Sequence, residues 1–264
     1  MQFFWLNVLI FLLGLAVGSF LNCVIFRLAE PTSFLKGRSK CPKCKQGLRW
    51  HDLIPILSYL ILGGKCRYCK RKISWQYPAV EISTGLIFLL IFNFYFSRLI
   101  GGQAIFNAVF LMIVSCFLIV IFVYDLKYYI IPDKIIYPAI VITFLYRLYE
   151  IIFNGSALLT TILSGLGAAT FFLLIVVMSR GKWMGVGDIK LAFLMGLLLG
   201  WPNILVALFF AFMAGALAGL AMIAAKKKTM KSEVPFGPFL AASVFVALFF
   251  GNAIINWYWS LLLI

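Results

Sequence analysis

Four cysteines stand in two pairs within the most basic stretch of the sequence, Cys41-Pro42-Lys43-Cys44 and Cys66-Arg67-Tyr68-Cys69. Each C-x2-C pair lets two thiolates from one tight turn reach the same ion, and the intervening 21 residues match a tetrahedral four-cysteine zinc site. Two disulfides or unliganded thiols are the alternatives, and the reducing cytoplasm in which the charge pattern places this stretch disfavours disulfides. We predict a structural zinc ion bound by Cys41, Cys44, Cys66 and Cys69.

Carboxylates are scarce, and the chain has eight of them: Glu30, Asp52, Glu81, Asp125, Asp133, Glu150, Asp188 and Glu233. Acids at membrane boundaries are costly and often mark functional sites. Asp125 lies at the C-terminal end of an expected span, where the helix dipole disfavours a negative charge. Asp188 follows Gly185-Val186-Gly187, whose two glycines permit unusual backbone and close approach by another chain. Helix stability therefore does not explain why an acid stands at position 125.

Asp125 and Asp188 are expected at the same depth, near the cytoplasmic boundary. Two carboxylates that share a proton can activate water and protonate a leaving group, as in aspartic proteases. Separate structural roles are the alternative, with Asp188 as a helix cap. Asp133 follows Pro132 in the first turn of a helix, where an acid stabilises the helix dipole. From the residues alone, the catalytic and structural interpretations of the pair both stand.

Other nucleophile systems have little support. His51 is the only histidine, so a Ser-His-Asp or Cys-His arrangement would have to use it from within the cysteine loop. Glycine motifs of the Walker and Rossmann types are absent from the sequence. We predict that His51 is a loop residue.

The composition indicates which elements hold these residues. Apolar residues make up 64% of the 264, only 12% are charged, and the mean hydropathy is +1.06, values that exclude a soluble globule. Apolar runs of roughly 20 residues predict an all-α membrane protein, a bundle of about eight transmembrane helices. The expected spans are 3–26, 78–97, 104–124, 132–153, 157–179, 189–201 (a short one), 203–225 and 236–262.

The basic residues set the predicted orientation. The net charge of +15 comes from 23 Lys and Arg against 8 Asp and Glu. Alternating the spans places all of these cations except Arg98 and Arg147 on one side, including the cluster from Lys226 to Lys231. Lys and Arg concentrate in cytoplasmic loops, so we predict both termini outside and the cysteine loop inside. This pattern accounts for the basic charge without nucleic acid as a partner.

Six short motifs together resemble the prepilin peptidase family, also called type IV leader peptidases, in the family's order. They are Gly18-Ser19-Phe20-Leu21-Asn22, the two cysteine pairs around Ile54-Pro55-Ile56-Leu57-Ser58-Tyr59, Ile73-Ser74 with Tyr77-Pro78, Asp125-Leu126 with Ile131-Pro132-Asp133, Gly185-Val186-Gly187-Asp188-Ile189-Lys190, and Pro235-Phe236-Gly237-Pro238.

The resemblance implies an enzyme of the bacterial inner membrane with two activities. It would cleave the basic leader of type IV prepilins and of type II secretion pseudopilins at the cytoplasmic face, and then methylate the new N-terminal residue with S-adenosylmethionine. The family belongs to the GxGD aspartyl proteases, which implies Asp125 and Asp188 as the catalytic pair. The expected domains are a first helix (1–28), a zinc loop associated with methylation (29–75) and a seven-helix peptidase region (76–264). Prepilins, pseudopilins and membrane lipids are the expected partners.

Three departures from the family's pattern fall in or beside the loop: Leu53 after Asp52, Gly63-Gly64-Lys65 before the third cysteine, and Gln76 before Tyr77-Pro78. They concern methylation and leave the protease motifs intact. A peptidase without methyltransferase activity is therefore one alternative. An ion-coupled carrier, in which Asp125 and Asp188 bind a proton or cation, is the alternative from another class.

Overall fold

The computed structural model describes residues 2–30, 39–96, 102–154, 158–225 and 234–262. Arg98, Glu233 and the lysine cluster from Lys226 to Lys231 lie outside them. In these ranges the regular elements are helices: α1 (Gln2–Leu28), η1 (Trp50–Leu53), α2 (Leu57–Ile61), α3 (Gln76–Phe96), α4 (Gly102–Tyr128), α5 (Asp133–Asn154), α6 (Leu158–Ser179), α7 (Val186–Leu199), α8 (Asn203–Ala224) and α9 (Gly237–Leu262).

Seven helices in the described residues are long and apolar enough to cross a membrane: α1, α3, α4, α5, α6, α8 and α9. The segment predicted as a short span at 189–201 corresponds to α7, which has 14 residues. At about 1.5 Å per residue it extends roughly 21 Å, less than the roughly 30 Å hydrocarbon core of a bilayer. The prediction of an all-helical, multi-pass membrane protein is confirmed.

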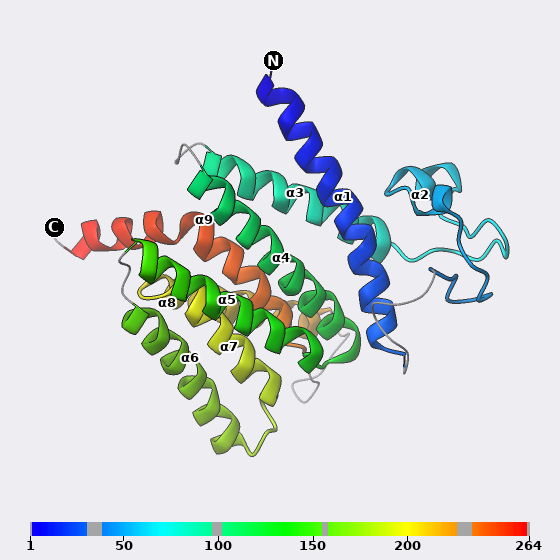
Figure 1. The fold of residues 1–264 in the computed structure, drawn as a ribbon. Helices are drawn as coiled ribbons and strands as arrows, with labels where there is room; N and C mark the ends of the chain where they lie inside the picture. The colour runs from blue at the N-terminus through cyan, green and yellow to red at the C-terminus, as the bar shows by residue number, and fades with distance from the viewer. Residues whose placement is uncertain (1, 31–38, 97–101, 155–157, 226–233, 263–264) are drawn as a thin grey trace. The chain divides into compact units, whose positions relative to one another are not determined.

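The chain divides into two compact units, residues 1–120 and 121–264. In the first unit, α1 and α3 pack antiparallel (Figure 1). Their contact is so close that a β-carbon on Gly14 would stand 2.6 Å from the Gly85 Cα, and one on Gly18 would stand 2.8 Å from the Glu81 Cα. Small residues therefore allow the two backbones to approach each other, as is common between membrane helices. The cysteine loop connects these two helices.

In the second unit, α7 is the central helix and packs against α5, α6, α8 and α9 (Figure 1). Its buried residues cover almost the whole helix after Lys190: Leu191, Ala192, Leu194, Met195, Gly196, Leu197, Leu198 and Leu199. A helix that is apolar all round buries all its faces, so the surrounding helices hold α7 rigidly. Asp188 stands in the first turn of this helix.

The C-terminal end of α7 is stabilised by a charged side chain from α5. Arg147 Nε donates a hydrogen bond to the Leu197 carbonyl at 2.9 Å, and Arg147 Nη2 donates to the Leu198 carbonyl. Glu150 forms an ion pair with the same guanidinium. The last carbonyls of a helix have no partners within it, and a cation there also complements the helix dipole. Arg147 therefore allows α7 to end within an apolar unit.

Candidate functional site

The two cysteine pairs have the same local backbone. Cys41 N–H donates to the Gln46 carbonyl and Cys66 N–H donates to the Arg71 carbonyl, both at 2.9 Å. The residue after the second cysteine of each pair has a positive φ, 59° at Lys45 and 58° at Lys70. Each pair is thus a tight turn closed by one isolated antiparallel bridge, the local geometry that brings two sulfurs to one side.

These turns bring all four thiols together. The Sγ atoms of Cys41, Cys44, Cys66 and Cys69 lie within 4.8 Å of one another, and Cys41 Sγ is 4.0 Å from Cys69 Sγ. All four are free thiols. A tetrahedral zinc ion with bonds of about 2.3 Å needs sulfurs about 3.8 Å apart. The donor set and its spacing fit such an ion and leave no coordination position open for a substrate.

Local hydrogen bonds also favour the thiolate form at one ligand. Burial by itself raises the pKa of the Cys41 thiol, but hydrogen bonds from the backbone of Cys44 and Lys43 and from the neighbouring thiols lower it to about 7. A metal ligand must be deprotonated. Cys41 is therefore prepared for metal binding near neutral pH.

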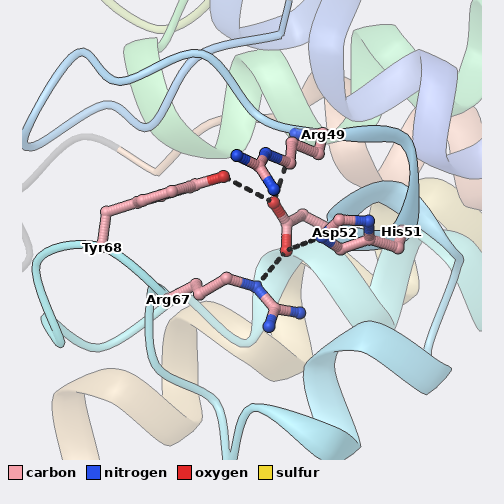
Figure 2. Close-up of polar contacts among 5 residues, drawn as sticks. All are labelled: Arg49, His51, Asp52, Arg67 and Tyr68. Carbon is pink, nitrogen blue, oxygen red and sulfur yellow. Dashed lines mark hydrogen bonds and ion pairs between the residues drawn. The ribbon is translucent and has the colours of Figure 1, made fainter.

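Asp52 joins the two halves of the cysteine loop (Figure 2). Its side chain is 3% exposed and accepts hydrogen bonds from Arg67 Nε at 2.7 Å, from the Arg49 backbone at 3.2 Å and from the Tyr68 hydroxyl at 3.3 Å. Burial alone raises the pKa of Asp52, but these hydrogen bonds and the charge of Arg67 hold it below its usual value. Arg67 and Tyr68 belong to the second cysteine pair, so Asp52 fixes the first half of the loop to the second.

His51 takes part in this cluster rather than in a nucleophile system. Its Nε2 lies 3.7 Å from Asp52 Oδ1 (Figure 2). Its ring packs edge-on against Trp50. Among the described residues, its polar contact is with a carboxylate that Arg67 already neutralises. The structure thus places His51 in the loop, as predicted, with a structural environment.

Asp125 and Asp188 are brought together in the second unit. Asp125, near the end of α4, is 5% exposed, and Asp188, in the first turn of α7, is 7% exposed. The Asp125 carboxylate accepts a hydrogen bond from the backbone of Gly237, and Asp188 Oδ2 accepts one from Gly185 N at 3.2 Å. The two carboxylates are close enough for their charges to interact. Each acid of this buried pair is therefore held by one backbone amide.

The glycines around this pair have different roles from those expected at the sequence level. A β-carbon on Gly187 would stand 2.9 Å from the Ile131 Cβ, so the close neighbour of Gly187 is a segment of the same chain. A β-carbon on Gly185 would meet no atom nearer than Asp188 Oδ2 at 3.9 Å. Gly187 allows the start of α7 to pack closely against Ile131, whereas a side chain at Gly185 would make only ordinary contacts.

Two contacts near the pair were missed by sequence reasoning. Gly237 lies in the Pro235-Phe236-Gly237-Pro238 motif, and its backbone hydrogen-bonds the Asp125 carboxylate. Asp133 was assigned a local helix role, yet its Oδ1 also accepts a hydrogen bond from Lys190 Nζ at 2.6 Å, two residues after Asp188. A sequence signal existed for the second contact, since Asp133 shares a motif with Asp125 and Lys190 follows Asp188 by two residues, but nothing in the sequence connects Gly237 with Asp125.

The fold and these two sites define a multi-pass helical membrane protein with a four-cysteine loop and a buried carboxylate pair. Residues 12–95 match the bacterial Peptidase A24 N-terminal domain, and residues 112–220 match the type IV leader peptidase family. The chain is 33% identical to the prepilin leader peptidase/N-methyltransferase of Bacillus subtilis, over 95% of this chain and 96% of the relative. The chain belongs to the type IV leader peptidase family, whose members are aspartic endopeptidases with an associated N-methyltransferase activity.

Two further relatives carry the same name. The protein of Aeromonas salmonicida is 30% identical over 97% of this chain and 94% of its own length. That of Pseudomonas aeruginosa is 28% identical over 94% of this chain and 91% of its own length. No solved structure matches the chain. The ion-coupled carrier, the alternative from another class, is set aside by this family membership.

Proposed function

We propose that this chain removes the basic leader of type IV prepilins and pseudopilins at the cytoplasmic membrane face. It then methylates the new N-terminal residue with S-adenosylmethionine as methyl donor. The relatives' shared name, prepilin leader peptidase/N-methyltransferase, supports both reactions. Because these matches cover more than nine-tenths of both proteins, they support assigning both activities to this chain.

The observation that carries the peptidase proposal is the buried pair of Asp125 and Asp188. Two neighbouring carboxylates share one proton, because both cannot be ionised at short separation. The ionised acid then takes a proton from water, whose oxygen attacks the peptide carbonyl. The protonated acid donates its proton to the leaving amine nitrogen as the C–N bond breaks. The two acids titrate as a coupled pair, so the shared proton is not assigned to either residue.

The membrane supports presentation of the substrate to this pair. A pilin-type substrate has a basic leader followed by an apolar helical stem, which a bilayer holds with the cleavage point near its surface. A helical peptide bond is shielded by its own hydrogen bonds, so the segment must unwind before attack. Gly185, whose backbone N–H binds the Asp188 carboxylate, is less tightly packed than Gly187, so we expect the unwound segment to approach Asp188 on this side. Anionic lipids would attract the basic leader at about 1 kcal/mol per cation.

The zinc ion in this proposal has a structural role. Cys41, Cys44, Cys66 and Cys69 would hold it, and when bound it supplies folding energy to a loop with little regular structure. The loop at 29–75 is assigned to methylation and the helices at 76–264 to proteolysis. The predicted sidedness, with the loop and acids inside and both termini outside, belongs to the same proposal and requires the short helix α7 to count as a crossing beside the seven longer helices.

Purified enzyme mixed with a prepilin in detergent tests the peptidase, with leader removal followed by the shift in gel mobility. Asp125→Asn and Asp188→Asn are expected to abolish cleavage while the protein still inserts and binds zinc. Asp133→Asn is the matched control and should retain most activity, because an exposed ion pair such as that with Lys190 is worth about 0–1 kcal/mol. Substantial cleavage by either of the first two variants would refute the catalytic pair.

Mass spectrometry of the cleaved pilin, with S-adenosylmethionine present, tests the second reaction. A product heavier by one methyl group at its N-terminus is expected from the wild-type enzyme. Efficient cleavage with no methylated product would favour the alternative of a peptidase without methyltransferase activity.

A further inference from the structure

A buried carboxylate in the first unit is used by neither the cysteine cluster nor the Asp125–Asp188 pair. Glu81, on α3, is 7% exposed. Its Oε2 accepts a hydrogen bond from the Ile56 backbone at 2.8 Å, and its carboxylate is also hydrogen-bonded by the Ser19 side chain. Ser19 lies on α1 and Ile56 in the cysteine loop, so three segments of this unit meet at one acid.

A second acceptor in the same helix interface has no partner. Asn22, on α1, is 2% exposed, and its Nδ2 donates a hydrogen bond to the Tyr77 carbonyl at 3.0 Å. The Asn22 Oδ1 atom is buried without a hydrogen-bond partner. A buried polar atom without a hydrogen bond destabilises the folded state, so the unpaired Asn22 Oδ1 points to a partner that the chain itself does not supply.

The packing register places these two acceptors near each other. Gly18 lies opposite Glu81, and Asn22 lies opposite Tyr77, one turn further along each antiparallel helix. Residues four apart share a helix face, with β-carbons about 5–6 Å apart. The Asn22 amide and the Glu81 carboxylate therefore stand about one helical turn apart in the α1–α3 interface.

The charge of this region is unbalanced. In the part of the chain that the structure describes, five ion pairs occur: Lys45–Glu30, His51–Asp52, Arg67–Asp52, Arg147–Glu150 and Lys190–Asp133. Glu81 belongs to none of them. A carboxylate offers about four acceptor positions and an amide oxygen two, so a group with several N–H donors and a positive charge would satisfy both residues.

The residues that are hydrogen-bonded to these two side chains are less buried than Glu81 and Asn22 themselves. Ser19, Ile56 and Tyr77 are each half-buried around the more deeply buried Glu81 and Asn22. Ile56 is held at φ 59° and ψ −51°, an unfavourable conformation for a β-branched residue, and this conformation accompanies the hydrogen bond from its N–H to Glu81.

We propose that Glu81 and Asn22 bind a primary α-ammonium group in the methyl-transfer reaction. The inference rests on the proposed function, because that reaction brings two such groups: the N-terminus of the cleaved pilin and the amino-acid part of the methyl donor. Glu81 would form a charge-assisted hydrogen bond with the ammonium, and Asn22 Oδ1 would accept a second one. A phosphate or carboxylate ligand would be repelled by Glu81, and two oxygen donors are too few for a calcium or magnesium ion.

Binding measurements on the full-length enzyme test the proposal without requiring turnover. The first probe is an apolar peptide with a free N-terminal amine, compared with its N-acetylated twin. The second is S-adenosylhomocysteine, the methyl donor without its methyl group. Glu81→Gln keeps the shape of the side chain and an acceptor for the Ile56 amide but removes the charge. This substitution should weaken the binding of whichever probe places its ammonium group at Glu81 by about 10- to 100-fold.

The outcomes are distinct. Loss of the preference for the free amine over the acetylated peptide would identify the pilin N-terminus as the ligand, and weaker S-adenosylhomocysteine binding would identify the methyl donor. Asn22→Ala should give the same selective loss at smaller size, and Glu30→Gln, which removes an exposed acid of the same unit, should change neither. Unchanged binding of both probes by Glu81→Gln would overturn the proposal.

Two controls distinguish loss of the ammonium site from disruption of the zinc loop and from failure of the proposed function. Zinc content should stay near wild type in Glu81→Gln, because the four cysteines are untouched. If Glu81→Gln loses zinc as well as binding, Glu81 acts only by holding the loop at Ile56, and the ammonium site is refuted. If the wild-type enzyme neither cleaves nor methylates, the proposed function fails, whatever the binding result.

Discussion

A β-carbon on Gly237 would stand 2.6 Å from Asp125 Oδ2, so the start of α9 and the end of α4 meet with no room for a side chain between them. The backbone of Gly237 also hydrogen-bonds the Asp125 carboxylate. The Ile131 side chain completes this arrangement, because it lies close to both Gly187 and Gly237. Three motifs that are separate in the sequence thus hold one acid of the pair in place.

Gly237→Ala should strongly reduce leader cleavage although it changes no charge. The added methyl group would push the Asp125 carboxylate away, and a shift of about 1 Å at a reacting group can cost about 100-fold in rate. Steady-state cleavage of a prepilin measures the effect. Gly219→Ala is the control, since a β-carbon there meets no atom within 4 Å, and near-normal cleavage by Gly237→Ala would contradict the role assigned to this contact.

Elemental analysis of protein purified without chelators should find one zinc ion per chain. Cys41→Ser and Cys66→Ser should lose it, because each removes one of four ligands that lie within 4.8 Å of one another. Cys116→Ser should keep the metal, since Cys116 lies in α4, outside the cluster. A metal-free wild-type protein, or an intramolecular disulfide among the four, would show that the site has another role.

Arg67→Ala should loosen the cysteine loop by about 1–3 kcal/mol, because it removes a charge-assisted hydrogen bond from a carboxylate that is 3% exposed. Faster hydrogen exchange of backbone amides around η1 would report the change. Lys45→Ala is the comparison, since the Lys45–Glu30 ion pair is more exposed and should matter little. Equal effects of the two substitutions would mean that Asp52 does not join the halves of the loop.

The contribution of Asp52 should also depend on pH in one direction. The pKa of Asp52 is lower in the folded loop than in an unfolded chain, so its stabilisation is complete above the unfolded value of about 3.9. It is lost as the pH falls from there through the folded value. The difference in loop protection between wild type and Asp52→Asn should therefore be constant near neutral pH and shrink below about pH 4. A difference that grew with acidity would have the wrong sign.

Arg147→Met should destabilise the second unit by roughly 2–4 kcal/mol, because two carbonyls at the end of α7 lose their donor and Glu150 loses its partner. The rate of thermal inactivation of cleavage is the measurement. Lys134→Met on the same helix, at an exposed position, should have little effect. Adding Glu150→Gln to Arg147→Met should recover part of the lost stability, because it removes the unpaired charge. A complete lack of recovery would show that the unpaired Glu150 carboxylate does not destabilise the unit.

Local features of the chain were predictable from sequence alone. The helical membrane fold follows from hydropathy along the chain, since each spanning helix satisfies its backbone hydrogen bonds within itself. The grouping of the four cysteines likewise follows from short-range geometry, because each C-x2-C turn sets the direction of its own two sulfurs. The candidate acids stood out because charges are rare in so apolar a sequence. The domain boundaries, the sidedness and the catalytic assignment of Asp125 and Asp188 stay predictions.

The partners of those residues were decided by the tertiary structure. Asp52 binds Arg67 across 15 positions, Glu81 binds Ile56 across 25, and Arg147 reaches Leu197 across 50. The sequence shows that each side chain needs a partner but not which one, because the choice depends on the register in which helices and loop pack. Close packing at glycines sets that register, as at Gly18 beside Glu81 and Gly237 beside Asp125. A glycine leaves no side-chain pattern to read, so these contacts become visible only once the backbones are placed.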